Sequence, residues 1–157
     1  MDNLVETFTD STRYVLSAVS GIEPEICENG GQDLSQSFVT GTLSLKGCAC
    51  GSMSISFTRE AIHRIYLKVF PNEEATITFS NMGDLAGEIT NMICGKAREI
   101  LSATGVRLYA TIPRILFGSR VHIGGEDPAC QVVHFKLDGD SLFLELKKSP
   151  VLNNQQR

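Results

Sequence analysis

Several features that would assign this chain to a common functional class are missing from its sequence. The net charge is -4 at pH 7, and the densest basic group is the pair Lys147-Lys148, so no basic surface for nucleic acid is predicted. No apolar run approaches the ~20 residues of a membrane span, and the opening segment MDNLVETFTD lacks the basic and apolar regions of a signal peptide. The sequence therefore predicts a cytoplasmic protein that binds neither nucleic acid nor a membrane.

A disulfide framework and a metal site are not indicated either. The cysteines are odd in number and follow no disulfide-rich pattern: Cys27, Cys48, Cys50, Cys94 and Cys130. Cys48-Ala49-Cys50 is the one close pair, and a C-x-C without a second pair is a weak indication of metal binding. We therefore favour free thiols over a structural metal and predict no metal site.

Familiar catalytic motifs are also missing. His63, His122 and His134 lie on a predicted helix, loop and strand, with no metal-ligand spacing between them. There is no Gly-rich phosphate loop, no G-x-S-x-G elbow and no Cys/His nucleophile motif. Any catalytic chemistry must therefore come from less familiar residues.

The composition is that of a folded domain. The chain has 157 residues, of which 42% are hydrophobic and 20% charged, and it contains no low-complexity segment or linker. We predict one domain over residues 1–150 and a frayed tail over 151–157.

Hydrophobic spacing divides this domain into helices and strands. Spacings of three, four and seven predict helices over 3–20, 58–69 and 83–103, with Thr58 as an N-cap and Pro71 as a stop. Alternation predicts hairpins over 38–57, with one buried face, and over 131–147 around Asp138-Gly139. Residues 73–80 are either a short strand or the approach to the next helix, and we favour an extended segment. Extended segments are also predicted over 106–112 and 115–117, and loops elsewhere. This order predicts an α+β sandwich of long helices on a largely antiparallel sheet built from hairpins.

The third helix is the most informative element. Six apolar residues fall on its buried side: Leu85, Ile89, Met92, Ile93, Ile100 and Leu101. Asp84, Glu88, Asn91 and Gly95 gather on a neighbouring arc, where Glu88 and Asn91 are one turn apart. Asn and Gly lower helix stability by several tenths to about 1 kcal/mol each relative to Ala. Spacing alone, however, is typical of an ordinary solvated pair.

The wider segment changes this interpretation, because it resembles the signature helix of the CheC/CheX/FliY phosphatases. Their pattern is an Asp or Ser, three residues, Glu, two residues and Asn, followed at a distance by a Pro. Asp84, Glu88 and Asn91 match in type and spacing, and Pro113 comes one residue earlier than is usual. The passages Phe57–Ile65 and Ile112–Gly118 are also similar to CheX proteins, and the order of elements agrees over roughly residues 3–148.

Within these families the chain resembles CheX more than CheC, because CheC proteins usually carry the Glu/Asn motif twice. Asp2, Glu6 and Thr9 repeat the spacing on the first helix, but Thr9 replaces Asn. We assign no activity to that position.

The resemblance implies a phosphatase for the aspartyl-phosphate of a CheY-like receiver domain, in chemotaxis or related two-component signalling. It implies that Asn91 positions a water and that Glu88 pairs with a lysine of the receiver. The receiver is expected to supply Mg²⁺, and this chain to bind no cofactor. Asp84, Gly95 and Pro113 are supporting positions, and a homodimer through sheet edges is expected. The alternatives are a binding module that holds a response regulator without hydrolysis, and a structural or assembly role.

Overall fold

The computed structural model describes residues 2–28, 34–119 and 129–149. The predicted tail, the loop residues Gly30-Gly31 and Gly124–Asp127, and His122 lie outside these ranges. In chain order the described elements are α1 (Asp2–Ser20), β1 (Glu25–Ile26), η1 (Leu34–Gln36), β2 (Ser37–Lys46), β3 (Cys50–Thr58), α2 (Arg59–Val69), η2 (Glu74–Thr76), α3 (Phe79–Ser102), β4 (Tyr109–Ala110), β5 (Arg114–Phe117), β6 (Cys130–Leu137) and β7 (Asp140–Lys148).

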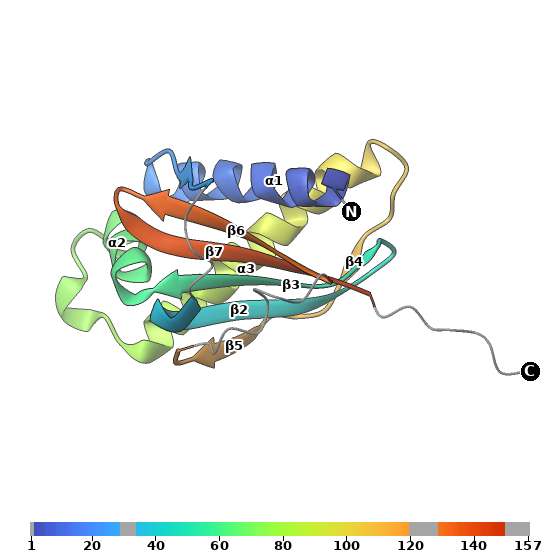
Figure 1. Cartoon of the computed structure of the whole chain (residues 1–157). Helices are drawn as coiled ribbons and strands as arrows, with labels where there is room; N and C mark the ends of the chain where they lie inside the picture. Colours follow the sequence, from blue (N-terminus) through green and yellow to red (C-terminus); the bar gives the residue numbers. More distant parts are fainter. Residues whose placement is uncertain (1, 29–33, 120–128, 150–157) are drawn as a thin grey trace, which may run out of the picture.

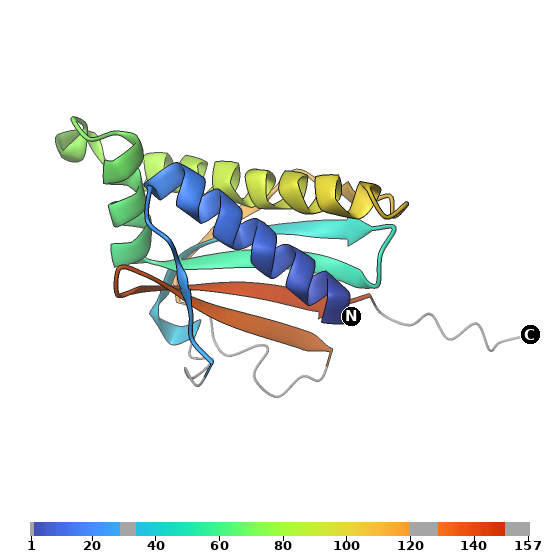
Figure 2. The same ribbon diagram turned by 90° about the horizontal axis from the view of Figure 1, so that it is seen from above.

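The strands form one antiparallel sheet (Figure 1). Its order is β1-β6-β7-β3-β2-β4. β5 pairs with the same edge of β2 as β4, at a different stretch of that strand. α1 and α3 lie on one face of this sheet, and α2 closes the end of the helical layer (Figure 2). The predicted sandwich of long helices on a largely antiparallel sheet is confirmed. No helix in the described part of the chain is long and apolar enough to span a membrane.

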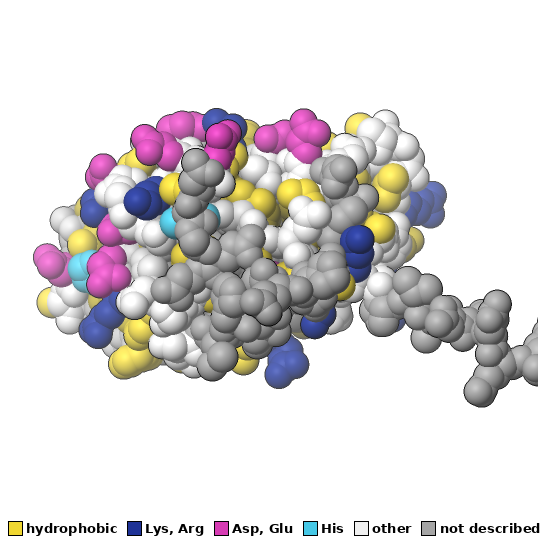
Figure 3. All heavy atoms as spheres, viewed as in Figure 1, with side chains coloured by type: hydrophobic (Ala, Val, Ile, Leu, Met, Phe, Trp, Pro, Cys, Tyr) yellow, Lys and Arg dark blue, Asp and Glu magenta, His cyan; other side chains and the backbone are white. Residues whose placement is uncertain are grey.

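α1 confirms the first predicted helix. Its apolar stripe turns Phe8, Val15 and Leu16 into the core, where each is at least 98% buried. The opposite side of α1 exposes Glu6 and Asp10, and acidic side chains gather along this edge of the molecule (Figure 3). The amphipathic pattern thus determines which side of α1 faces the sheet.

The β2–β3 hairpin has the predicted strands, but the prediction of one buried face is wrong. Val39 pairs with Phe57 and Leu43 with Met53, all on the face that packs against the helices. On the other face Thr40 and Ser56 are also buried, 1% exposed each, and their hydroxyl groups are 2.8 Å apart. Because these hydroxyls satisfy each other across the strands, they do not need water.

α2 begins where predicted and is tied to the far hairpin. The Thr58 hydroxyl accepts a hydrogen bond from the Ala61 N–H at 3.2 Å and caps the helix. One turn later the Arg64 guanidinium bonds Asp138 and Asp140 at 3.2 and 2.5 Å. Asp138 lies in the β6–β7 turn and Asp140 directly follows it; in the turn Asp138 and Gly139 have positive φ values of 51° and 90°. The pairing of α2 with this turn fixes the end of the helical layer.

The segment over residues 73–80 is the approach to α3, so the favoured extended segment is wrong for most of it, although Ile77 and Thr78 keep extended backbone angles. Residues Glu74–Thr76 form η2, and α3 begins at Phe79, four residues before the predicted start. The Thr78 hydroxyl accepts a hydrogen bond from the Asn81 N–H at 3.1 Å, and the Asn81 side chain donates to Thr76 O at 2.8 Å. These two bonds favour a helix start over the strand that the alternating letters suggest.

After α3, the predicted extended run over 106–112 is mostly irregular. The Val106 N–H donates to Leu101 O, and Arg98 Nε donates to Leu108 O at 3.1 Å, so residues 106–108 bond back to the helix. Only Tyr109–Ala110 pairs with β2 as β4. The predicted strand after Pro113 is confirmed as β5.

Candidate functional site

α3 presses closely on the sheet through small residues. Gly41 of β2 faces Thr90, and a Cβ added at Gly41 would overlap the Thr90 hydroxyl and lie 3.3 Å from Ala86 O. Gly83 and Gly87 similarly accept the side chains of Phe117 and Ile115 from β5. These contacts hold the backbone of α3 at a fixed height and rotation, which determines what the helix exposes.

The predicted buried stripe of α3 is wrong at Met92. This side chain is 42% exposed, whereas Ala86, Thr90, Cys94 and Ala97 are buried instead. Small residues can approach the sheet closely, so the helix turns them inward and rotates Met92 outward.

The structure brings the predicted site residues of α3 together. Asp84, Glu88, Asn91 and Gly95 are all exposed. At ~100° per residue they share an arc of about 60° opposite the sheet. Within that arc Glu88 faces the side of α2 and Asn91 faces the side of β5. The helix therefore presents a carboxylate and an amide side by side on one ridge.

No side chain of the described residues engages either member of this pair. In the described ranges Glu88 and Asn91 make no side-chain hydrogen bond or ion pair with a described residue. Gly95, one turn beyond Asn91, has no atom within 4 Å of where a Cβ would stand. The donors and acceptors of the pair are thus available to an outside partner, and the surface beside them is open.

Pro113 lies beside the same ridge. β5 runs antiparallel to α3, because Phe117 lies against Gly83 and Ile115 against both Gly83 and Gly87. A strand advances ~3.3 Å per residue and a helix ~1.5 Å, so Pro113 lies level with about residue 91 of α3. Pro113 is half-buried, and its rigid ring immediately precedes the edge strand β5.

On its other side Glu88 borders a depression of about 320 Å³ between α2 and α3. Tyr66, Phe70 and Glu73 supply one wall, and α3 supplies the other through Asn81, Asp84, Leu85 and Glu88. Sequence reasoning missed the first wall, because its position depends on how α2 packs against α3. The one available signal was the i, i+4 spacing of two aromatic residues at the end of α2.

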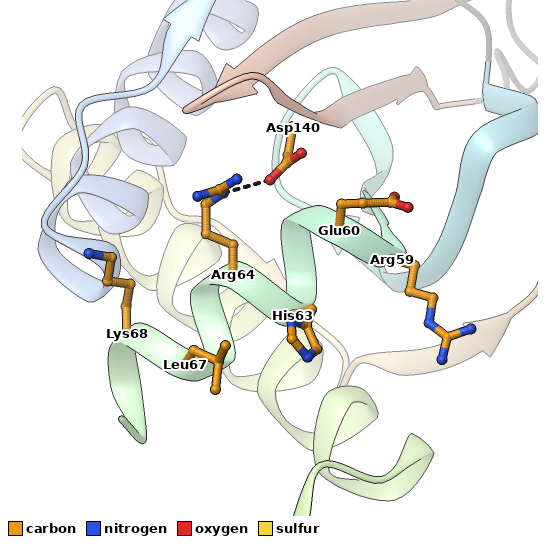
Figure 4. Close-up of a pocket in the computed structure, with 7 residues that line it drawn as sticks. All are labelled: Arg59, Glu60, His63, Arg64, Leu67, Lys68 and Asp140. Carbon is orange, nitrogen blue, oxygen red and sulfur yellow. Dashed lines mark hydrogen bonds and ion pairs between the residues drawn. The ribbon is translucent and has the colours of Figure 1, made fainter. Parts of the chain in front are cut away.

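A larger depression, about 600 Å³, lies away from this ridge on the outer side of α2 (Figure 4). It is lined by Arg59, Glu60, His63, Arg64, Leu67, Lys68 and Asp140. In Figure 4 Arg64 points to Asp140, and these two are the ion pair that fixes α2. His63 is among the lining residues, and none of the α3 motif residues is.

The surroundings of the thiols and of His134 indicate structural roles. No disulfide joins any two of the five cysteines. Burial raises the pKa of Cys50 to about 11 and raises that of Cys94, so both stay protonated at neutral pH. His134 stacks on Phe143 and lies 2.8 Å from the Ser141 hydroxyl, and burial lowers its pKa. Within the described ranges no three His, Cys, Asp or Glu residues are placed to hold a metal ion.

The second motif lies on α1, as its spacing predicts. Glu6 is exposed, but Thr9 is only half-exposed. A threonine hydroxyl also lacks the two donors and one acceptor of an amide.

The chain matches a family model described as "Chemotaxis phosphatase CheX" over residues 39–136, more than half of its length. No curated protein matches the sequence. Among solved structures it is similar to the chemotaxis protein CheX from Vibrio vulnificus, with 23% identity, a TM-score of 0.78, and coverage of 93% of this chain and 96% of that one.

Two further structures show the same likeness. A CheC-like superfamily protein from Shewanella sp. PV-4 is 24% identical, with a TM-score of 0.75 and coverage of 93% and 97%. A CheX–CheY–BeF3–Mg²⁺ complex from Borrelia burgdorferi is 22% identical, with a TM-score of 0.72 and coverage of 91% and 96%. At these identities the structural likeness establishes the fold, and the family model establishes the family.

Proposed function

Because the chain belongs to the chemotaxis phosphatase CheX family, we propose that Glu88 and Asn91 carry out its reaction, the hydrolysis of the aspartyl-phosphate on a CheY-like response regulator. One observation carries this assignment. On the exposed ridge of α3 a carboxylate and an amide lie one turn apart, and no described residue engages either of them.

The proposed substrate is supported by the composition of a similar complex. The Borrelia burgdorferi structure joins CheX to CheY with BeF3 and Mg²⁺. By analogy we expect this chain to meet a phosphorylated CheY-like receiver in the cytoplasm. The metal is expected to belong to the receiver, where it neutralises charge on the phosphoryl group.

We assign to Asn91 the positioning of the water that attacks the phosphorus. An acyl phosphate is already labile, and what a receiver lacks is a water held in line behind the phosphorus. An amide has one acceptor and two donors, so it can orient that water without changing charge. Positioning of this kind is worth about 10²-fold in rate, or about 3 kcal/mol of the barrier.

We assign to Glu88 the contact that fixes the position of the docked receiver. Its carboxylate would accept charge-assisted hydrogen bonds from the active-site lysine of the receiver. The i, i+3 spacing lets both side chains enter one receiver pocket together. Asp84 would steer the approach, Gly95 would leave room for the receiver backbone, and Pro113 would fix the neighbouring edge.

We also propose a homodimer through the sheet edge at β5. This strand pairs with β2 on one side, and no described strand pairs with its other side. Ile112, Leu116 and Phe117 are exposed along this edge, by 87%, 44% and 47%. An open edge with apolar side chains is a surface that proteins normally cover. A strict monomer in sedimentation at micromolar concentration would contradict the dimer without touching the catalytic assignment.

The catalytic test is phosphate release from phosphorylated receivers in Mg²⁺, with wild type beside Asn91→Ala and Glu88→Ala. We expect Asn91→Ala to lower kcat about 10²-fold and Glu88→Ala to reduce activity chiefly through binding. Glu99→Ala is the matched control, because it removes an exposed carboxylate from the same helix about 16 Å further along. Circular dichroism verifies that each variant is folded. Full activity in both Asn91→Ala and Glu88→Ala would refute the assignment, and binding with an unchanged phosphate lifetime would favour a non-catalytic module.

A further inference from the structure

The depression between α2 and α3 contains groups that the proposed reaction does not use. We propose that it is a docking site for a second cationic side chain of the receiver, a lysine or arginine outside the receiver's own active site. This inference rests on the proposed function, since it extends the surface around Glu88. It assigns the choice among receivers to Tyr66, Phe70 and Glu73, which lie outside the α3 motif.

One wall of the depression is aromatic. Tyr66 and Phe70 are one turn apart at the end of α2, with ring centroids 5.0 Å apart. Tyr66 is 3% exposed and Phe70 is 40% exposed, so Phe70 presents apolar surface to solvent above a buried ring. Leu85 of α3 faces them across the depression. Such walls can pack against the alkyl part of a lysine or arginine side chain and against its charged group.

The chain turns sharply to bring a carboxylate to this wall. The Phe70 N–H donates to Tyr66 O at 2.8 Å and ends α2, and the Glu73 N–H donates to Phe70 O at 3.2 Å. The Tyr66 hydroxyl then lies 3.4 Å from Glu73 Oε2. Glu73 is thereby held beside the rings, although it is exposed and lies in the turn between α2 and α3.

The charge of the lining has one sign. Glu73, Asp84 and Glu88 contribute three carboxylates, and among the described residues that line the depression there is no Lys, Arg or His. In the described part of the chain none of the three forms an ion pair with a described cation. Their summed field favours a cation and repels phosphate or acidic side chains. A hydrated metal ion would gain nothing from the rings, whereas a lysine or arginine would contact both the rings and the carboxylates.

The place of the depression makes it a recognition surface. Glu88 lines it and also stands on the ridge with Asn91, so a receiver docked on the ridge would cover it. A second cationic contact, set across from the ridge, would fix the rotation of the receiver about the Glu88–lysine pair. We therefore expect the site to act on affinity and on the choice of receiver, and not on the chemical step.

The experiment compares Glu73→Gln with Glu74→Gln. These neighbours are both exposed and lose the same charge, but only Glu73 lines the depression. Affinity for a receiver activated by fluoroberyllate and Mg²⁺ is measured by calorimetry, and KM and kcat are measured with the phosphorylated receiver. For Glu73→Gln we expect a three- to fivefold loss of affinity and a matching rise in KM, about the strength of an exposed ion pair, with kcat unchanged. Phe70→Leu, which keeps apolar bulk but removes the ring, should also raise KM.

The two proposals fail separately. Equal affinities for Glu73→Gln and Glu74→Gln would overturn the docking site while leaving the phosphatase intact. Weakened binding by Glu73→Gln alone, together with no phosphate release by the wild type, would support the docking site and refute the catalytic assignment. Restored affinity between Glu73→Lys and a receiver in which one surface lysine or arginine is changed to Glu would identify the occupant. Failure of every such exchange would overturn the docking site.

Discussion

α1 and α3 lie on the same face of the same sheet, yet only α3 presents an intact motif (Figure 2). Both carry an acidic residue three positions before a polar one, Glu6 and Thr9 in α1 and Glu88 and Asn91 in α3. α1 directs its hydroxyls inward: those of Ser11 and Thr12 are buried and donate to backbone carbonyls four residues earlier, at 2.7 Å each.

The surroundings of the two helices differ as well. α3 is anchored through Gly41, Gly83 and Gly87 and has walls on both sides, the end of α2 and the edge strand β5. No described glycine would place a Cβ against α1. The two helices therefore share the spacing but differ in three features of the proposed site: an exposed amide, a fixed height above the sheet and two flanking walls.

The sharpest way to break this comparison is to move the amide. In the double variant Asn91→Ala/Thr9→Asn, we expect kcat to stay about 10²-fold below wild type, because α1 lacks the walls that seat a receiver. Thr9→Asn alone should leave kcat unchanged. Phosphate release measures both, and recovery in the double variant would show that the spacing suffices.

The anchoring of α3 is tested at Gly41. Gly41→Ala should lower the free energy of unfolding by about 1–3 kcal/mol, because its Cβ overlaps the Thr90 hydroxyl and forces the helix from the sheet. Urea unfolding measures the change. Retained stability would mean that α3 is held no more firmly than α1.

The exposed ridge is tested at Gly95, where the expected sign is reversed. Gly95→Ala should raise the free energy of unfolding by about 0.5–1 kcal/mol, since the position is open and Ala favours helix. If the receiver approaches closely there, KM should rise despite the added stability. An unchanged KM would leave Gly95 outside the interface.

The smallest effect is expected from neither helix but from the opposite face of the sheet. Burial lowers the pKa of His134 from its ordinary 6.5, so the unfolded chain binds a proton there before the folded chain does. Stability should therefore fall as the pH drops below about 6.5. His134→Gln should flatten that slope in urea unfolding series at several pH values. An unchanged slope would assign the acid sensitivity elsewhere.

Local patterns predicted much of this molecule from sequence. The helix cap at Thr58 and the turn at Asp138-Gly139 depend on neighbouring residues, and both were predictable. The exposed arc of Asp84, Glu88, Asn91 and Gly95 also follows from helix geometry alone.

One error was local. The sequence of residues 75–79 alternates like a strand, but the side-chain bonds of Thr78 and Asn81 start a helix there. The other errors arose where contacts between distant elements decide. Met92 has the spacing of a core residue, but Gly41 lets Thr90 take the inner position. The depression beside Glu88 could not be predicted, because it depends on how α2 packs against α3.

The lack of described partners for Glu88 and Asn91 has a consequence for turnover. Both side chains are exposed, so we expect each to sample several rotamers until a receiver binds. Fixing a long polar side chain in one rotamer costs on the order of 1–2 kcal/mol of conformational entropy. Under the proposed function that cost would subtract from the affinity for the receiver. It would therefore shorten the residence time of the dephosphorylated receiver on the pair.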